Sequence, residues 1–509
     1  MMNELYSYLK SPENRIILII TSILLAVYFV MIYSYTYSYP FWGDDWYFIS
    51  LIERFRDPND QSLFTYIVPY AGGLHPDIIE KAYVFLFYQI ANCFDYKWSV
   101  VLANLLVIPI LAFFLHYMIR MGLSRWKILG MLFVFFSLKG NIDNFNFGGV
   151  MMHDLVAVIF IVGAAYLFAI KNQYAASIII TNLFLLLVSS EAIGLLFLLN
   201  FLSFCYQAKY RYLTLLLSVV CTFLFFEGYQ LSKELLQLPS SSFRVNYGLI
   251  LGPIVFVGGL VNRINIASLL GFFVILFVGY NYLRRHVNTR EENDLSHYFL
   301  PIILFSLLVI GLLVQIGRGI DSSGQVIFSS LMANRFAYFH LMALLILYIS
   351  LAEIVSFRQW KVSLFFLTMS VLFYGVNFYN YLPLLKFEMK RIEADAYNFK
   401  INYTCLNYKV EDSFARKLAH VDWFVWPSFS NLEQMKNYQP VQYQANYEGE
   451  LVHFVLMTPN VVDSNTFAFL HGGRKLVFIC RKTAENTYQA TLNAKQISDL
   501  GKLTIVQLY

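Results

Sequence analysis

Long apolar segments alternate with short polar turns along most of the chain. A helix that crosses a membrane needs about 20 mostly apolar residues, and the first such segment is Ile16–Tyr35. The later ones are Trp98–Met118, Ile128–Leu138, Met151–Ile170, Ala175–Val188, Ala192–Cys205, Tyr212–Tyr229, Ile264–Tyr282, Phe299–Ile316, Phe336–Ile354 and Val362–Tyr381. The pattern predicts an all-α polytopic membrane domain with about 11 transmembrane helices over residues 1–384.

Three stretches depart from this pattern. Phe48–Phe55 gathers its apolar residues on one helical face. Ile78–Phe94 is apolar enough to resemble a span, but counting it would place the basic turn 120–127 on the outer side. We therefore expect amphipathic helices on the outer membrane surface within residues 46–94. Leu249–Leu260 contains glycines and Pro253, which favours a re-entrant or surface element.

Basic residues collect in the turns between apolar segments. Lys10 and Arg15 precede the first segment, and further Lys and Arg residues lie in nearly every second turn. The positive-inside rule places these turns and the N-terminus in the cytoplasm. This distribution explains the net charge of +5 without nucleic acid as a partner. Because no small-residue cleavage site follows the first segment, we expect it to be retained.

The composition becomes polar after about residue 385. Lys386–Phe399 is typical of a helix, and Thr466–Leu470, Lys475–Cys480 and Leu503–Leu508 are typical of short strands. We expect residues 385–509 to form a small α+β domain outside the cytoplasm. There a disulfide between Cys405 and Cys480 is chemically permitted, and a pair of free thiols is the alternative.

Two adjacent carboxylates, Asp44 and Asp45, follow the first span between Trp42 and Trp46. Charge at this depth is costly unless it is wet, paired or used. A positioned carboxylate can take the proton of a weakly nucleophilic sugar hydroxyl as a bond forms. The alternative is a solvated Gly-Asp-Asp turn with the tryptophans as interfacial anchors.

Glu191 lies between two predicted spans, and His75 and His153 fall on the same predicted outer side. Glu191 either faces the cavity of Asp44 or stabilises the N-terminus of the following helix. A single histidine is more often structural than catalytic, so His75 and His153 are candidates only for substrate contact. Their spacing does not form a metal-ligand cluster.

Arg318 and Arg335 bracket another predicted outer loop, and Tyr338 follows one turn later. The planar guanidinium matches phosphate oxygens, so these residues are candidates for binding a lipid-linked phosphate. The alternatives are arginines that extend to the interface and a structural ion pair. The chain lacks a phosphate-binding P-loop, a dinucleotide fingerprint and a G-x-S-x-G elbow.

The early motif Trp42-Gly43-Asp44-Asp45-Trp46, the amphipathic stretches after it and the soluble tail resemble the GT-C class of membrane glycosyltransferases. Size and layout are similar to serotype-converting O-antigen glucosyltransferases of bacteria and phages. The resemblance covers roughly Ile16–Tyr381 and implies a bacterial inner-membrane protein with a periplasmic C-terminal domain.

The resemblance also implies a mechanism. The donor would be a sugar, glucose in the similar enzymes, on a polyprenyl phosphate, and the acceptor a surface polysaccharide such as the lipopolysaccharide O-antigen. Asp44 or Asp45 would act as general base with Glu191 as a further acidic residue, and Arg318 and Arg335 would hold the departing phosphate. No cofactor is implied, and we leave out a metal because the two carboxylates are adjacent rather than separated. A flippase and a sugar-phosphate-lipid synthase are the expected protein partners.

Two other functions fit the same pattern of spans. A polysaccharide polymerase or ligase also uses outer arginines and lipid-linked substrates, but its loop usually comes late in the chain. A lipid-linked-sugar flippase or transporter would place its polar groups near the bilayer midplane. The position of the acidic motif after the first span favours the glycosyltransferase over both.

Overall fold

The structure is a computed structural model of the 509-residue chain. It describes residues 8, 11–12, 14–37, 39, 49, 51–52, 56, 78–141, 149–235, 247–261, 263–288, 295–318, 326–332, 336–355, 360–403, 406, 419–435, 438–449, 451–458, 464–471, 474–484, 486–494, 497 and 504–508.

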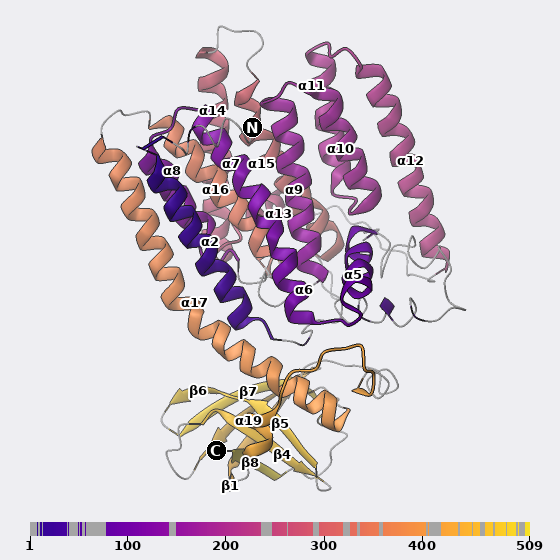
Figure 1. The fold of residues 1–509 in the computed structure, drawn as a ribbon, viewed down its shortest axis with the longest axis vertical. Coiled ribbons are helices and arrows are strands. Elements are labelled where there is room, and N and C mark those ends of the chain that lie inside the picture. The colour runs from indigo at the N-terminus through magenta and orange to yellow at the C-terminus, as the bar shows by residue number, and fades with distance from the viewer. Residues whose placement is uncertain are drawn as a thin grey trace.

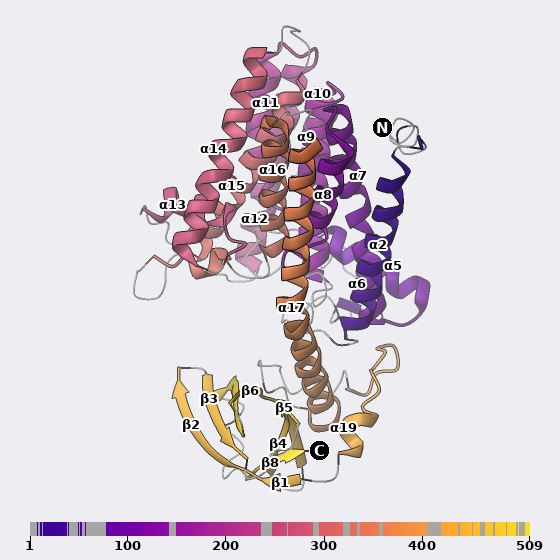
Figure 2. The same ribbon diagram turned by 90° about the vertical axis from the view of Figure 1, so that its left-hand side faces the viewer.

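Helices that run roughly side by side form a bundle, and a β-sandwich lies beyond one end of it (Figures 1 and 2). We call this the domain-side end and the other the opposite end. The helices are α2 (Arg15–Tyr35), α5 (Ile78–Ala91), α6 (Tyr96–Ala103), α7 (Val107–Arg120), α8 (Arg125–Phe135), α9 (Gly149–Ala169), α10 (Tyr174–Leu187), α11 (Ala192–Cys205), α12 (Arg211–Leu235), α13 (Gly248–Val257), α14 (Ile264–Asn288), α15 (Phe299–Arg318), α16 (Ala337–Ile354), α17 (Trp360–Asn402) and α19 (Ser430–Gln434). Short 3-10 helices are η1 (Asn104–Leu106), η3 (Ser296–Tyr298) and η4 (Ser329–Met332).

Seven helical segments in the described part of the chain are long and apolar enough to cross a membrane. They are Arg15–Tyr35, Tyr96–Arg120, Arg211–Gly228, Ile264–Val287, Ser296–Ile316, Ala337–Ile354 and Trp360–Asn402. The predicted mostly helical architecture with several candidate spans is therefore confirmed, whereas the count of 11 spans is not. Helix α8 has 11 residues, and α10 and α11 have 14 each. At about 1.5 Å per residue these helices are shorter than a hydrocarbon core of about 30 Å.

Successive helices run in alternating directions. Helix α2 ends and α6 begins at the domain-side end, and α12 begins at the opposite end and descends toward the domain (Figure 1). The basic turns near Arg120, Lys171 and Lys209 lie at the opposite end (Figure 1). This alternation agrees with the direction that the sequence pattern predicted for each segment.

Helix α13 is short and packs against α14 and α15. It carries Pro253 and is followed by Gly258. A Cβ atom at Gly258 would lie 1.8 Å from the Ala267 carbonyl oxygen, and one at Gly271 would lie 1.9 Å from the Ile254 carbonyl oxygen. The two backbones therefore touch, which only glycine permits. At 10 residues α13 is too short to cross a membrane, as expected for Leu249–Leu260.

Helix α17 joins the bundle to the β-sandwich (Figures 1 and 2). Its 43 residues include Pro383 and extend about 65 Å at 1.5 Å per residue. The predicted last span and the predicted helix Lys386–Phe399 are thus two parts of one helix. The expected domain boundary at residues 384–385 falls inside it.

The C-terminal domain is a sandwich of two four-stranded antiparallel sheets. One has the order β1-β8-β4-β5 and the other β2-β3-β7-β6. The strands are β1 (Tyr438–Pro440), β2 (Gln442–Glu448), β3 (Leu451–Met457), β4 (Thr466–His471), β5 (Arg474–Ile479), β6 (Arg481–Ala484), β7 (Thr487–Asn493) and β8 (Thr504–Leu508). The three predicted strands correspond to β4, β5 and β8.

The sandwich has its own core, and one of its sheets is covered on both faces. Phe454, Phe469 and Phe478 lie between the sheets with other apolar side chains. On the other face of the β1-β8-β4-β5 sheet, Val477 and Val506 are buried in the cluster that includes α17. Cys480 is buried with a free thiol, and Cys405 lies outside the described residues.

Candidate functional site

Acidic and histidine side chains from three parts of the chain gather at the domain-side end of the bundle. They are Glu80 on α5, His153 near the start of α9, and Glu191 in the turn between α10 and α11. The sequence singled out His153 and Glu191 but not Glu80. We call these three residues the acid–histidine cluster.

Glu80 and His153 form a hydrogen-bonded pair, which is an ion pair when the imidazole is protonated. Glu80 is 0% exposed, and its Oε1 atom lies 3.2 Å from Nδ1 of His153. Helix α5 packs on α9, which brings the two side chains together. A carboxylate on one imidazole nitrogen fixes the ring orientation and leaves the other nitrogen for a different partner. This is the arrangement of an oriented general base.

Glu191 supplies a second buried carboxyl. Its backbone N–H donates to Oγ of Ser189 at 3.3 Å, which holds the turn before α11. The Oε2 atom is buried and has no hydrogen-bond partner among the described residues. Burial raises the pKa of the Glu191 carboxyl, and the positive charge of nearby His153 opposes part of that rise. An unsatisfied buried carboxyl is costly and marks a candidate functional group.

Together these groups can move a proton and hold a cation or a polyhydroxyl ligand. No three of the described His, Cys, Asp and Glu side chains converge in a way that would hold a metal ion. The cluster offers two carboxyls and one imidazole, which are groups that can donate and accept protons.

Several of the predicted site residues lie outside the described residues: Trp42, Asp44, Asp45, Trp46, His75 and Arg335. Arg318 ends helix α15, and only its backbone is described. Tyr338 is buried in the bundle, and its hydroxyl has no partner among the described residues. The structure thus brings together two of the predicted residues, His153 and Glu191.

Aromatic side chains anchor the chain just before the acidic motif. Tyr39 is buried, with ring centroids 5.9 Å from Phe399 of α17 and 6.1 Å from Trp426 of the tail. Phe399 stacks on Trp426 at 5.9 Å. The chain that leaves α2 is therefore fixed at Tyr39 by both the long helix and the C-terminal segment. We call Tyr39, Phe399 and Trp426 the aromatic anchor.

The tail also binds the bundle through backbone contacts next to α5. The Phe94 N–H donates to the Trp423 carbonyl at 2.6 Å, and the Val425 N–H donates to the Phe94 carbonyl at 3.1 Å. On the same segment, Asp422 pairs with Arg56 at 3.4 Å. The segment that leads into the C-terminal sandwich is thus bound just beyond Ala91, at the end of α5 opposite to Glu80.

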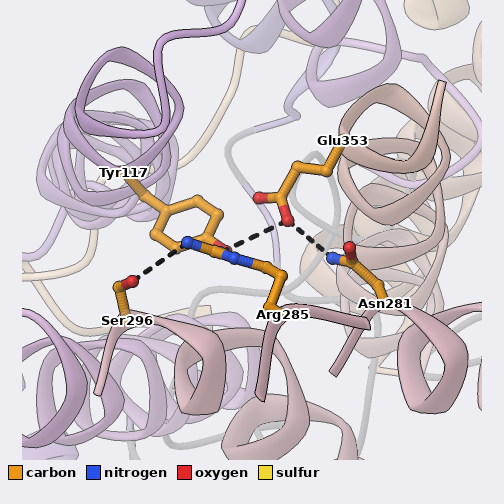
Figure 3. A network of polar contacts seen from close by, with 5 residues as sticks. All are labelled: Tyr117, Asn281, Arg285, Ser296 and Glu353. Carbon is orange, nitrogen blue, oxygen red and sulfur yellow. Dashed lines mark hydrogen bonds and ion pairs between the residues drawn. The ribbon is translucent and has the colours of Figure 1, made fainter. Parts of the chain in front are cut away.

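A different polar network closes the opposite end of the bundle (Figure 3). Arg285 donates to the Tyr117 hydroxyl and to Oγ of Ser296, each at 3.0 Å, and lies 3.4 Å from Oε2 of Glu353. Asn281 donates to the same Glu353 oxygen at 2.6 Å. The network joins α7, α14, α16 and η3, and we interpret it as structural because its groups bond to one another.

Comparison of the chain with protein-family models, with curated protein sequences and with solved structures found no match. The class that fold and site define is a multi-span helical protein with an acid–base cluster and a β-sandwich at the same end of its bundle.

Proposed function

We propose that this chain is a GT-C-type membrane glycosyltransferase that moves a hexose from a polyprenyl phosphate to a surface polysaccharide. The observation that carries the proposal is the acid–histidine cluster at the domain-side end of the bundle. Proton-transfer groups are needed where a hydroxyl becomes a nucleophile. A lipid-linked donor must be met at a membrane interface, and the cluster lies at one end of the apolar helices.

The chemistry follows from these groups and from the acidic motif of the first loop. Asp44 or Asp45 takes the proton of the acceptor hydroxyl while its oxygen forms a bond to the anomeric carbon. The bond from that carbon to the phosphate oxygen breaks, and polyprenyl phosphate leaves with the electron pair. Arg318 and Arg335 stabilise the charge that develops on the phosphate. The sugar is transferred with inversion.

The acid–histidine cluster has a supporting role in this scheme. His153, oriented by Glu80, donates a hydrogen bond to a sugar hydroxyl or to the carboxylate of the base. Glu191 sets the charge of the pocket, because its raised pKa keeps it neutral to a higher pH than an exposed glutamate. The pocket can then take a neutral sugar next to an anionic phosphate.

The proposal places the domain-side end outside the cytoplasm, in bacteria in the periplasm. Its support is the collection of basic residues at the opposite end, where Lys127 donates to the Ala352 and Val355 carbonyls at 2.6 Å and Arg284 to that of Ile354 at 2.6 Å. The positive-inside rule assigns such an end to the cytoplasm.

Mass spectrometry of surface polysaccharide from cells with and without the chain tests the proposal. We expect one added hexose per repeat, lost in Asp44→Asn or in Asp45→Asn while the protein still inserts and folds. Wild-type transfer by both variants would refute the assignment of the base. An unchanged repeat with altered polymer length would instead identify a polymerase or a transporter.

A further inference from the structure

Among the described residues, no other layer covers one face of the β2-β3-β7-β6 sheet. Its inner face packs into the sandwich core through Val452, Phe454 and Leu456. The β1-β8-β4-β5 sheet lies between it and α17, so its outer face points away from the long helix (Figure 2). All seven residues of the edge strand β2 are exposed.

The outer face combines amides and hydroxyls with a central row of Leu451, Val455 and Met457. His453 lies within this row, 3.3 Å from Oε2 of Glu448 and 3.0 Å from Oγ1 of Thr491. The strand register places Gln444 beside Val455 and then Gln489, and Asn446 beside His453 and then Thr491. On the middle strand, Leu451 is 43% exposed and Met457 is 41% exposed. The outer-face residues are Gln442, Gln444, Asn446, Glu448, Leu451, His453, Val455, Met457, Arg481, Thr487, Gln489, Thr491 and Asn493. We call this set the amide face.

Two exposed tyrosines lie on the edge strand β2, on the side that faces the sandwich core. Tyr443 is 39% exposed and Tyr447 is 59% exposed, both on the side of β2 opposite Gln444 and Asn446. Exposed edge strands are usually protected by lysine or proline within the strand. Strand β2, with the sequence QYQANYE, has neither, and its one charged residue is Glu448, so its edge is accessible.

We propose that the amide face binds the polysaccharide acceptor, a neutral glycan chain. Sugar rings present C–H faces that pack on apolar or aromatic side chains, and hydroxyls that both donate and accept hydrogen bonds. Gln and Asn side chains offer both functions in one group. The small number of charges on the face fits a neutral ligand and argues against a nucleic acid, which would need clustered Lys and Arg.

The placement of the domain suits this role. The Asn398 side chain on α17 donates to the Val477 carbonyl at 2.6 Å and accepts from the Val477 N–H at 2.7 Å. Asn402 donates to the Lys475 carbonyl at 3.0 Å. These bonds fix the sandwich on α17, so a chain bound to the amide face is held at a constant distance from the acid–histidine cluster. The inference rests on the proposed function, because the cluster is where the acceptor would react.

Calorimetric titration of the full-length protein in nanodiscs with delipidated surface polysaccharide from the source cells tests the inference. The variant is the triple substitution Gln444→Ala, Asn446→Ala and Gln489→Ala. The matched control is Asn431→Ala with Gln434→Ala, which removes two exposed amides from α19 on the other side of the sandwich. We expect affinity to fall about 10-fold or more in the variant, since each lost hydrogen bond weakens binding severalfold, and to stay unchanged in the control.

Equal affinity of the variant and the wild type would overturn the inference. A titration in which the wild type shows no binding would also overturn it. So would a concentration-dependent dimer in which the backbone amides of β2 are protected from hydrogen exchange without polysaccharide, because such a dimer would assign the edge strand to contact with a second copy of the chain. Binding needs no turnover. Binding that depends on the amide face without sugar transfer would therefore refute the proposed function alone, and transfer without such binding would refute the inference alone.

Discussion

The buried Glu80 carboxylate lies 3.2 Å from Nδ1 of His153 and fixes the orientation of the imidazole ring. Replacing Glu80 by Gln keeps the shape of the side chain and removes its charge. We expect kcat for sugar transfer to fall about 10-fold or more, while KM for the lipid donor changes little. Steady-state kinetics on the purified protein measures both. An increase in donor KM with unchanged kcat would contradict a role in positioning His153.

Burial of the Glu191 carboxyl makes its charged form unfavourable and so destabilises the folded protein at neutral pH. Its pKa is raised in the folded protein, so stability is greatest below the unfolded-state pKa of about 4.3 and decreases as pH rises through the folded-state pKa. We expect Glu191→Gln to stabilise the protein by about 1 kcal/mol at pH 7.5, with a smaller gain at pH 5, and to slow transfer. Thermal unfolding in detergent at the two pH values measures this.

The control for this prediction is Glu433→Gln, at an exposed position on α19. We expect no stability gain from it at either pH. A gain for Glu191→Gln that is equal at pH 5 and pH 7.5 would refute burial of the charge as the cause.

At the residue scale, the sequence identified residues with unusual chemistry but not the side chains with which they pair. His153 and Glu191 were found because charged groups near apolar segments are unusual. Glu80 was missed, although Glu80 and Lys81 are the only charged residues in the otherwise apolar helix α5, which was the available signal. Its pairing with His153 depends on how α5 packs against α9, and the spacing of residues along the chain does not reveal it.

Helix α14 offers a matched pair of glycines for testing how α13 is seated. A Cβ at Gly271 would collide with the Ile254 carbonyl, whereas one at Gly279 would meet nothing within 4 Å. We expect Gly271→Ala to destabilise the protein by about 2–3 kcal/mol and Gly279→Ala to stabilise it by up to about 1 kcal/mol. Thermal unfolding of the two variants decides the point. Equal effects would mean that α13 does not rest on α14.

At the element scale, apolar periodicity located the described helices of the bundle, but it did not show which of them are long enough to cross a membrane. Segments such as Ala175–Val188 and Ile128–Leu138 end where the chain must turn, so their helices fall short of a full span. Strands β4, β5 and β8 were predicted because they are apolar, and β4 and β5 also flank a glycine turn. Strand β2 was missed because all of its residues are exposed, and an exposed polar strand lacks the alternation that reveals strands.

At the scale of the whole molecule, α17 determines where the C-terminal domain sits. The sequence predicted a span and a separate helix because the composition changes near residue 385. In the structure the two are one helix, which continues through Pro383. A proline near the boundary of a span removes one hydrogen bond and is tolerated where packing continues on both sides. The aromatic anchor supplies that packing beyond the bundle. The last span and the domain therefore form one continuous element.

The alternating directions of the helices predict which residues share a side of the membrane. Asn172 lies in the α9–α10 turn and Gln207 in the α11–α12 turn, and both are at the opposite end, whereas Gln444 lies on the sandwich. In a variant without native cysteines, we expect single cysteines at 172 and 207 to react with a membrane-impermeant maleimide only after cells are opened. A cysteine at 444 reacts in intact spheroplasts.

Labelling of position 207 on the side of position 444 would mean that α10 and α11 do not cross the membrane as a pair. Helices of 14 residues can instead form a hairpin that enters and leaves the membrane on one side. Labelling of 172, 207 and 444 on the same side would refute a membrane between the basic turns and the domain, and with it the proposed site on the outer face.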